Sequence, residues 1–267
     1  MISCLTVTRE ARVASLRRAV HDYARQTWSE RELVIVHDGG AAFDADLHAL
    51  AASYAGAAIA IHRVAGPRTL GELRNASIAA ARGDIVCQWD DDDRYHPRRL
   101  ELQLAAMRVE NNDFCFLTDQ LHLFAAEATM FWDDWNLEVH PLNLVQGTLL
   151  GRKAALGSYP PLARGEDTPL VLDLLRRGCR ITRLREHGYL YVYVFDGRNA
   201  WDYDHHAAIS AWKRFRGPRL LALEPTLRAR LAEYDPPLGR CVMPYAGGEL
   251  VFGELSPRET GGAPASG

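Results

Sequence analysis

The sequence predicts an α/β protein with a mostly parallel sheet flanked by helices. In the first half, apolar runs of strand length alternate with segments whose apolar residues recur at helical spacing. One such run, residues 85–89, leads directly into four consecutive aspartates, as expected where a parallel strand ends at a ligand-binding edge. The second half is less regular, so we expect it to form an irregular half of the same domain.

Each element follows from its local pattern. Apolar, β-branched runs predict strands at residues 2–7, 33–36, 58–64, 85–89, 114–117 and 189–195. Helices are predicted by apolar stripes at Val13, Leu16, Val20 and Tyr23; at Leu47, Leu50, Ala51 and Tyr54; across residues 70–81; at Leu100, Leu104 and Met107; and at Val171, Leu174 and Leu175. Pro97 suits the start of the fourth of these helices. The Gly/Pro/Ser-rich residues 256–267 are expected to be a disordered tail.

Composition limits the class of protein. With 267 residues, 48% of them hydrophobic, the chain can bury one large core. A net charge of -3 with no basic run among aromatics argues against a nucleic-acid partner. The five cysteines are odd in number and lie mostly in apolar segments, which favours reduced thiols. No basic leader or apolar stretch of about 20 residues is evident, so we expect a cytoplasmic protein.

The cluster Asp90-Asp91-Asp92-Asp93 is the strongest sign of chemistry. Adjacent carboxylates repel one another and raise their own pKa values unless a positive charge lies among them. A hard divalent cation that also binds phosphate oxygens supplies that charge. The cluster therefore indicates an enzyme that handles a diphosphate with Mn²⁺ or Mg²⁺.

Three other interpretations of the cluster are weaker. Acidic runs are often solvated loops, but this one follows a strand that reads as buried. A calcium loop of the EF-hand type would place Arg94 at a ligand position and Tyr95 where glycine is needed. A helical aspartate-rich motif of the prenyl-diphosphate type conflicts with the strand-like residues before the cluster and with Pro97 after it.

Several short motifs follow one another in a characteristic order. They are Leu5-Thr6-Val7-Thr8, Gln26-Thr27-Trp28, His37-Asp38-Gly39-Gly40, Leu73-Arg74-Asn75, Ala81-Arg82-Gly83-Asp84, Asp90-Asp91-Asp92-Asp93 with Pro97, and Gly165-Glu166-Asp167. Each is weak alone, but together, over roughly residues 2–193, they resemble glycosyltransferase family 2. The resemblance implies the GT-A fold, a Rossmann-like sheet. It assigns residues 1–120 to a nucleotide-sugar-binding half and residues 121–255 to an acceptor-side half of the same catalytic domain.

The resemblance also implies a metal-dependent, inverting transfer of sugar from a nucleoside-diphosphate sugar, with a UDP-sugar expected. Asp92 is the expected metal ligand, and Asp167 is the expected general base that takes the acceptor proton. Asp90 and Asp91 are expected to contact the donor or its metal-bound water, with their roles not separable.

Donor contacts are also expected from residues at the other strand ends. Asp38 is expected to contact the base or ribose, where Gly39-Gly40 allows close approach. Thr6 and Thr8 line the same edge of the sheet, although ordinary strand-end polar residues would look alike. Arg74 is expected to pair with the diphosphate or with Asp38. A solvent-exposed arginine on a helix, with no ligand role, is an almost equal alternative.

Some interpretations stay open. Asp167 also suits a helix N-terminus stabilised by the macrodipole. His206, with His205, is either a metal ligand, as late histidines are in some GT-A enzymes, or part of a surface pair on a loop. Trp132 and Trp135, with Asp133-Asp134, suit an acceptor platform or core filling.

Two residues depart from the family pattern. His37 replaces the first of a pair of aspartates, which puts base or ribose contacts in doubt. Asp196 stands where related sequences often have histidine, which puts a metal role there in doubt.

Two other function classes compete with sugar transfer. A sugar-nucleotide nucleotidyltransferase needs a glycine-rich loop after the first strand, and Val7-Thr8-Arg9-Glu10-Ala11 contains no glycine. A catalytically silent nucleotide-sugar-binding module would not need both Asp92 and Asp167. The sequence leaves the acceptor open among glycans, lipid-linked molecules and small molecules. Peripheral association with the inner face of a membrane and a homodimer are both compatible with it.

Overall fold

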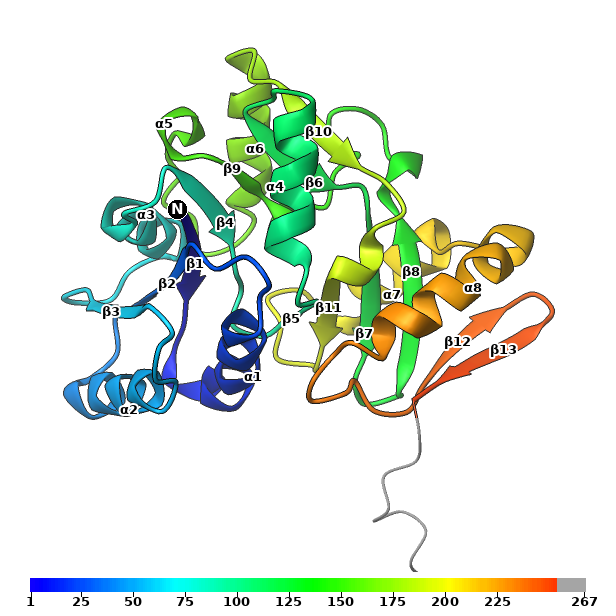
Figure 1. Cartoon of the computed structure of the whole chain (residues 1–267), viewed down its shortest axis with the longest axis horizontal. Coiled ribbons are helices and arrows are strands. Elements are labelled where there is room, and N and C mark those ends of the chain that lie inside the picture. The colour runs from blue at the N-terminus through cyan, green and yellow to red at the C-terminus, as the bar shows by residue number, and fades with distance from the viewer. Residues whose placement is uncertain (254–267) are drawn as a thin grey trace, which may run out of the picture.

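The computed structural model of the chain describes residues 1–253, and the tail predicted at 256–267 lies outside the described residues. The described chain forms two sheets flanked by helices (Figure 1). The first has seven strands in the order β10-β6-β9-β4-β1-β2-β3, and the second has six in the order β13-β12-β8-β7-β11-β5. Figure 1 shows β1–β4 at one side of the molecule and the hairpin of β12 and β13 projecting at the other.

The first sheet confirms the predicted α/β class. Its strands are β1 (Ile2–Val7), β2 (Arg31–His37), β3 (Ile59–Arg63), β4 (Ile85–Gln88), β6 (Phe114–Leu117), β9 (Leu150–Arg152) and β10 (Ile181–Leu184). Every neighbouring pair is parallel except those that β9 makes with β4 and β6. The carboxyl ends of β1, β2 and β4 therefore meet at one edge, which is where open α/β sheets bind ligands.

Helices cover both faces of this sheet, which explains its nearly continuous apolar strands. Along the described chain the helices are α1 (Val13–Ala24), α2 (Ala41–Ala52), α3 (Leu70–Ala80), α4 (Arg99–Val109), α5 (Lys153–Leu156), α6 (Asp167–Arg176), α7 (Tyr203–Lys213) and α8 (Gly217–Leu231), of which α7 packs on the second sheet. Leu33 and Ile35 of β2 pack in one core with α1, α2 and α4. Val34 and Val36, which point to the opposite face, pack in a second core with α3 and α6.

Local sequence sets the ends of the helix that carries Arg74. Thr69 and Glu72 form a reciprocal capping box at the start of α3, each side chain accepting a backbone N–H of the other. Gly71 is required there because a Cβ would lie 1.8 Å from the carbonyl oxygen of Pro160. The segment before α6 therefore packs directly on the first turn of α3.

The second sheet is where the structure departs most from the prediction. One of its strands, β11 (Tyr191–Phe195), lies within the strand predicted at 189–195. The others, where no strand was predicted, are β5 (Arg94–Tyr95), β7 (Asp119–Phe124), β8 (Thr129–Asp134), β12 (Cys241–Tyr245) and β13 (Gly248–Phe252). Strands β7 and β8 bury polar side chains, among them His122 and Asp133, which interrupt the apolar pattern that reveals a strand. The structure also starts β11 later than residue 189, after a 3-10 turn at Gly188–Leu190.

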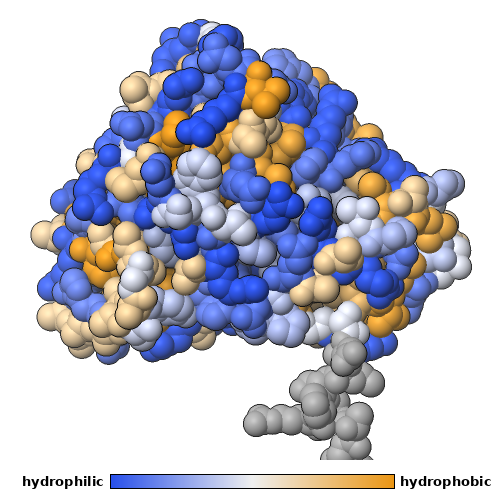
Figure 2. Space-filling view, viewed as in Figure 1, coloured by the Kyte–Doolittle hydropathy of each residue, from blue (hydrophilic) through white to orange (hydrophobic). Residues whose placement is uncertain are grey.

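The remaining features of the described chain concern membrane-spanning helices, the surface and the cysteines. No helix within residues 1–253 is long and apolar enough to cross a membrane. The face drawn in Figure 2 is mostly hydrophilic, with apolar areas in separate places. All five cysteines are free thiols, as predicted, and four of them are buried.

Candidate active site

A cavity of about 940 Å³ opens at the sheet edge where β1, β2 and β4 end. From the first half, its lining includes Thr8, Arg12, Asp38, Arg74 and Asp90–Asp93. From the second half, it includes Gln146, Asp167, Tyr193, Asn199, His206 and Lys213. The volume suits a ligand of nucleotide-sugar size. Nearly all of the predicted site residues are thus brought to one place.

Thr6 is the exception among them. Its hydroxyl donates to the carbonyl oxygen of Trp89 at 2.7 Å, and its side chain is fully buried between β1 and β4. The expectation that Thr6 contacts the nucleotide was wrong, because this bond ties the two strand ends together. Thr8 is also buried but lines the cavity.

Asp38 reaches the cavity from the end of β2. Its carboxylate accepts the backbone N–H of Arg68 at 2.9 Å. Packing rather than ligand approach explains the glycine at position 39, because a Cβ there would lie 2.6 Å from the ring of Phe43. His37 turns away from the cavity and contacts Asp44 at 3.0 Å. The departure from the family pattern at His37 therefore leaves Asp38 as the polar side chain of that strand end.

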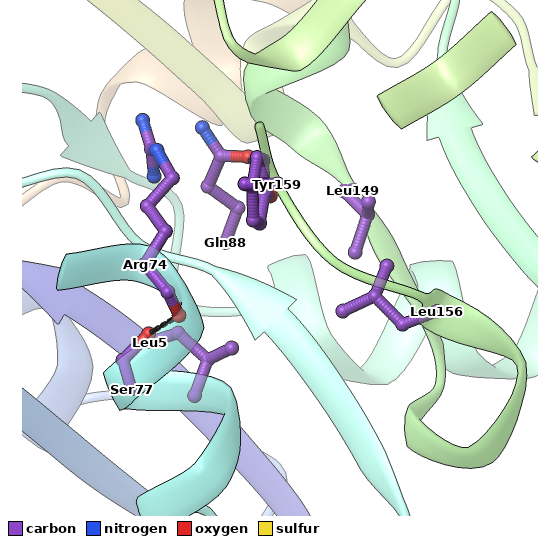
Figure 3. A pocket seen from close by; sticks show the side chains of 7 residues that line it. All are labelled: Leu5, Arg74, Ser77, Gln88, Leu149, Leu156 and Tyr159. Carbon is purple, nitrogen blue, oxygen red and sulfur yellow. Dashed lines mark hydrogen bonds between the residues drawn. The ribbon is translucent and has the colours of Figure 1, made fainter. Parts of the chain in front are cut away.

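The four aspartates have different partners, and Asp90 is bound to the protein on two sides. It accepts from Gln88 Nε2 at 2.9 Å and pairs with Arg74 Nη1 at 2.9 Å. Figure 3 shows Arg74 extending from α3 toward Gln88 and Tyr159; with Ser77 and three leucines, these residues line a small cavity of about 10 Å³. Asp90 is thereby fixed in place.

Asp93 lines the cavity, but its hydrogen bonds tie it to the second sheet. It accepts from the hydroxyl of Tyr191 at 2.5 Å and from the backbone N–H of Val194 at 3.0 Å. Burial, with the charge of Asp90 adding to it, raises the pKa of Asp93 to about 7. Asp93 therefore anchors the aspartate loop to β11 of the second sheet.

Asp91 and Asp92 face a guanidinium that no sequence motif predicts. Arg12, at the start of α1, pairs with Asp92 and lies 3.8 Å from Asp91. Asn199 Nδ2 approaches the same oxygen of Asp92 at 3.4 Å. Burial raises the pKa of Asp91 to about 6, against the pull of Arg12. No sequence signal marks Arg12 or Asn199, since both come from elements distant in the chain.

The oxygens of Asp91 and Asp92 suit a hard divalent cation. Within residues 1–253, no three His, Cys, Asp or Glu side chains are grouped so that they could hold a metal ion. Mg²⁺ in particular is often held by one or two carboxylates together with substrate phosphates. The residues present therefore fit a cation whose remaining ligands come from a bound diphosphate.

His206 lies elsewhere in the wall than its predicted role suggests. It belongs to α7, whose start is capped by Asp202, so the expected loop is a helix. Its ring packs against those of Tyr193 and Phe195, with centroids 5.1 Å and 4.8 Å apart, and is nearly inaccessible. Burial lowers its pKa to about 3, so the ring is neutral. The interpretation as a surface pair holds for exposed His205 but was wrong for His206. No group of metal-ligating side chains within residues 1–253 includes His206, so nothing there supports its predicted metal role.

Beside His206 is a buried polar cluster of His122, Asp133 and Ser210. His122 Nδ1 and the Ser210 hydroxyl each lie 3.0 Å from Asp133 Oδ2, and the hydroxyl is 3.0 Å from the same ring nitrogen. A nucleophilic triad needs the serine at the other ring nitrogen, so this cluster is not one. It orients His122 at the acceptor-side wall.

The two predicted platform tryptophans separate. Trp132 is buried, donates to Asp119 at 2.6 Å and stacks on Phe215, so it fills the core. Trp135 lines the cavity, with the ammonium of Lys213 4.7 Å from its ring centre. Only Trp135 remains a candidate for contact with an acceptor.

Arg74 connects the aspartate cluster to α6. Its guanidinium lies 2.9 Å from Asp90, 2.7 Å from Glu166 and 3.9 Å from Asp167. The expectation that Arg74 pairs with Asp38 was wrong, since these three carboxylates surround it instead. A buried guanidinium is stable here because several carboxylates compensate its charge.

Asp167 is the first residue of α6 and faces the same cavity. Its side chain keeps an exposed fraction of 26%, and its Oδ1 makes no hydrogen bond within residues 1–253. Burial raises the pKa of Asp167 to about 7; the charge of Arg74 opposes the rise and that of Glu166 adds to it. A carboxylate at a cavity wall that exchanges its proton near neutral pH is suited to general base catalysis.

Comparison with known proteins agrees with this arrangement. Residues 3–119 match the family described as "Glycosyl transferase family 2". No curated protein matches the sequence significantly.

Solved structures of S. aureus TarS resemble the chain. The structure of TarS 1-349 in complex with UDP-GlcNAc superposes with a TM-score of 0.59 at 16% identity, covering 88% of this chain and 67% of that one. The complex with UDP gives 0.58 at 15%, covering 87% and 79%. A longer TarS structure gives a TM-score of 0.57 at 16% identity. That match covers 78% of this chain but only 42% of the TarS chain. At such identities the likeness establishes the α/β fold.

Proposed function

We propose that this protein is a glycosyltransferase that moves a sugar from a UDP-sugar to an acceptor hydroxyl with inversion, assisted by Mn²⁺ or Mg²⁺; the match of residues 3–119 to glycosyl transferase family 2 supports the proposal. One observation carries the proposal. The carboxylates of Asp91 and Asp92, whose oxygens suit a divalent cation, and the carboxylate of Asp167 face a single cavity. Transfer needs both kinds of group, one beside the leaving diphosphate and the other beside the acceptor hydroxyl.

The donor occupies the side of the cavity formed by the first half. Asp38 accepts hydrogen bonds from the base or ribose, while Thr8 and Asp91 lie deeper along the same edge. The complexes of TarS with UDP-GlcNAc and with UDP support a uridine nucleotide here. When bound at Asp91 and Asp92, a divalent cation neutralises the leaving diphosphate as a Lewis acid.

The acceptor occupies the side of the cavity formed by the second half. Asp167 accepts the proton of the attacking hydroxyl, and the bond forms on the face of the sugar opposite the leaving diphosphate, which inverts the anomeric carbon. Since the pKa of Asp167 is raised to about 7, the base form grows as the pH rises through 7. Arg74 keeps Asp167 and Asp90 at a fixed separation by pairing with both.

A binding screen tests the donor assignment. The melting temperature is measured with UDP, GDP, CDP and ADP, each with Mn²⁺ and with EDTA. UDP with Mn²⁺ is expected to give the largest rise, because a ligand stabilises only the folded state that binds it. A preference for another base would overturn the uridine assignment, and an equal rise with EDTA would overturn metal dependence.

A product assay separates the competing function classes. Incubation with UDP-GlcNAc and Mn²⁺ is expected to release free UDP, at least through transfer to water. A nucleotidyltransferase would instead release pyrophosphate from UTP and a sugar phosphate. A binding module would release neither product while still binding the nucleotide.

A further inference from the structure

We propose that Arg12 is an internal counter-cation of the metal site, which holds Asp92 in the metal-free enzyme and is displaced when the donor and the divalent cation bind. This inference rests on the proposed function, since it concerns the site where the donor diphosphate is bound. It assigns a role to a side chain outside every motif of the sequence.

The contacts of Arg12 place its positive charge beside the carboxylates of Asp91 and Asp92. Its Nη1 pairs with Asp92 Oδ2 and lies 3.8 Å from Asp91 Oδ1. The side chain of Arg12 has an exposed fraction of 11% and that of Asp92 16%, so water screens the pair poorly. One guanidinium therefore compensates the two carboxylates that fit a divalent cation.

The same oxygen is also occupied from the other side of the cavity. Asn199 Nδ2 lies 3.4 Å from Asp92 Oδ2 and donates to the carbonyl oxygen of Val194 at 3.0 Å. A cation bound to Asp92 Oδ2 meets a guanidinium and an amide donor there. Both repel it, and the charged guanidinium repels it more strongly.

Within residues 1–253, the carboxylates that pair with Arg12 are those of Asp91 and Asp92. Its second terminal nitrogen donates to the backbone oxygen of Arg198 at 3.1 Å, and the nearby carboxylate of Asp196 is already paired with Arg198. Asp91 and Asp92 are the only acidic side chains that pair with Arg12 within residues 1–253. A diphosphate in the cavity offers an alternative anion of the kind that guanidinium groups bind well.

These contacts make cation binding depend on the donor. Without a diphosphate, a divalent cation gains few protein ligands and must displace Arg12 from Asp91 and Asp92, its acidic partners within residues 1–253. With a diphosphate present, the phosphate oxygens both complete the coordination of the cation and receive Arg12. The two ligands should therefore bind with strong positive coupling.

Calorimetric titration of Mn²⁺ alone into the metal-free enzyme tests the inference. Arg12→Gln is expected to bind Mn²⁺ at least about tenfold more tightly than the wild type when no nucleotide is present. Arg12→Lys, which keeps the charge, is expected to bind Mn²⁺ about as weakly as the wild type. The matched control is Arg17→Gln on an exposed turn of the same helix, which should leave Mn²⁺ affinity unchanged.

A second titration, with saturating UDP present, measures the coupling. The factor by which UDP strengthens Mn²⁺ binding should be smaller in Arg12→Gln than in the wild type, because displacement of Arg12 no longer opposes the cation. Melting temperatures of the four proteins show whether each variant is folded. If Arg12→Gln does not fold, the Arg12→Lys and wild-type titrations decide: tight Mn²⁺ binding by either one without UDP contradicts the inference.

The outcomes separate the inference from the proposed function. If the wild type binds Mn²⁺ with UDP, and Arg12→Gln binds Mn²⁺ alone no better than the wild type, the role of Arg12 is wrong and the proposed function stands. If the wild type binds no Mn²⁺ even with UDP, metal dependence itself fails and the inference fails with it.

Discussion

At the scale of single residues, the four aspartates of the cluster have different roles, although they are identical and adjacent in the sequence. Asp90 is fixed by Arg74, Asp91 and Asp92 share Arg12, and Asp93 is held by β11. Position along the loop therefore decides whether a carboxylate serves the ligand or the fold. Single substitutions can separate these roles.

Asp92→Asn should abolish the part of UDP affinity that depends on Mn²⁺ while the fold survives. The variant keeps the size of the side chain but loses the charge that holds a cation, and Asp92 lies at a cavity wall rather than in the core. Calorimetry of UDP with Mn²⁺ and with EDTA measures the effect. Asp84→Asn, an exposed aspartate before β4, is the control; UDP affinity with Mn²⁺ that equals the control would exclude Asp92 as a ligand.

Asp38→Ala should weaken UDP binding equally with Mn²⁺ and with EDTA. Its proposed contacts are to base or ribose, so the loss should be about 1–3 kcal/mol in both conditions. UDP titrations under the two conditions provide the measurement. A loss seen only with Mn²⁺ would place Asp38 in the metal site and refute the nucleotide-contact assignment.

At the scale of elements, the decisive contacts join strands and helices that are distant in the chain. Asp93 joins the loop after β4 to β11, and Arg74 joins α3 to the start of α6. These bridges carry the aspartate loop and Asp167 to the same cavity. The geometry of the site thus depends on buried charged groups whose protonation matters for stability.

Asp93→Asn should change how stability varies with pH. The pKa of Asp93 is raised to about 7 in the folded protein, from an ordinary value near 3.9. Protonation of Asp93 therefore stabilises the folded state relative to the unfolded state. That favourable contribution is fully present below about pH 4 and is lost as the pH rises through 7. Relative to the variant, the wild type should therefore lose several degrees in melting temperature between pH 5 and pH 8. Parallel melting curves over this range would show that Asp93 is ionised throughout.

The sequence was most informative where pattern and structure are both local. Helical stripes and apolar runs predicted α1–α4, α6 and strands β1–β4 and β6 of the first sheet, and the aspartates after residue 89 located the cavity edge. Of the second sheet only β11 was predicted; β7 and β8 were missed because they bury His122 and Asp133 at positions where an apolar residue would reveal a strand. Arg12 and Asn199 were missed because long-range folding alone brings them to Asp92.

At the scale of the whole molecule, the two sheets meet around one cavity to which each half contributes one requirement of transfer. The first half supplies Asp38 and the carboxylates of Asp91 and Asp92, for which we propose cation binding, and the second supplies Asp167 and the wall with His206 and Trp135. The central claim is that Asp167 acts as the base for transfer from a donor held by the other half.

The most direct test compares the wild type with Asp167→Asn in two measurements: the affinity for UDP-GlcNAc, and the rate of UDP release in the presence of Mn²⁺. Asparagine keeps the shape of the side chain but cannot accept the proton, so the rate should fall by about 100-fold or more while the donor Kd barely changes. Asparagine at a helix start costs little stability, so a merely structural carboxylate would leave the rate nearly normal. A near-wild-type rate of UDP release would contradict the account.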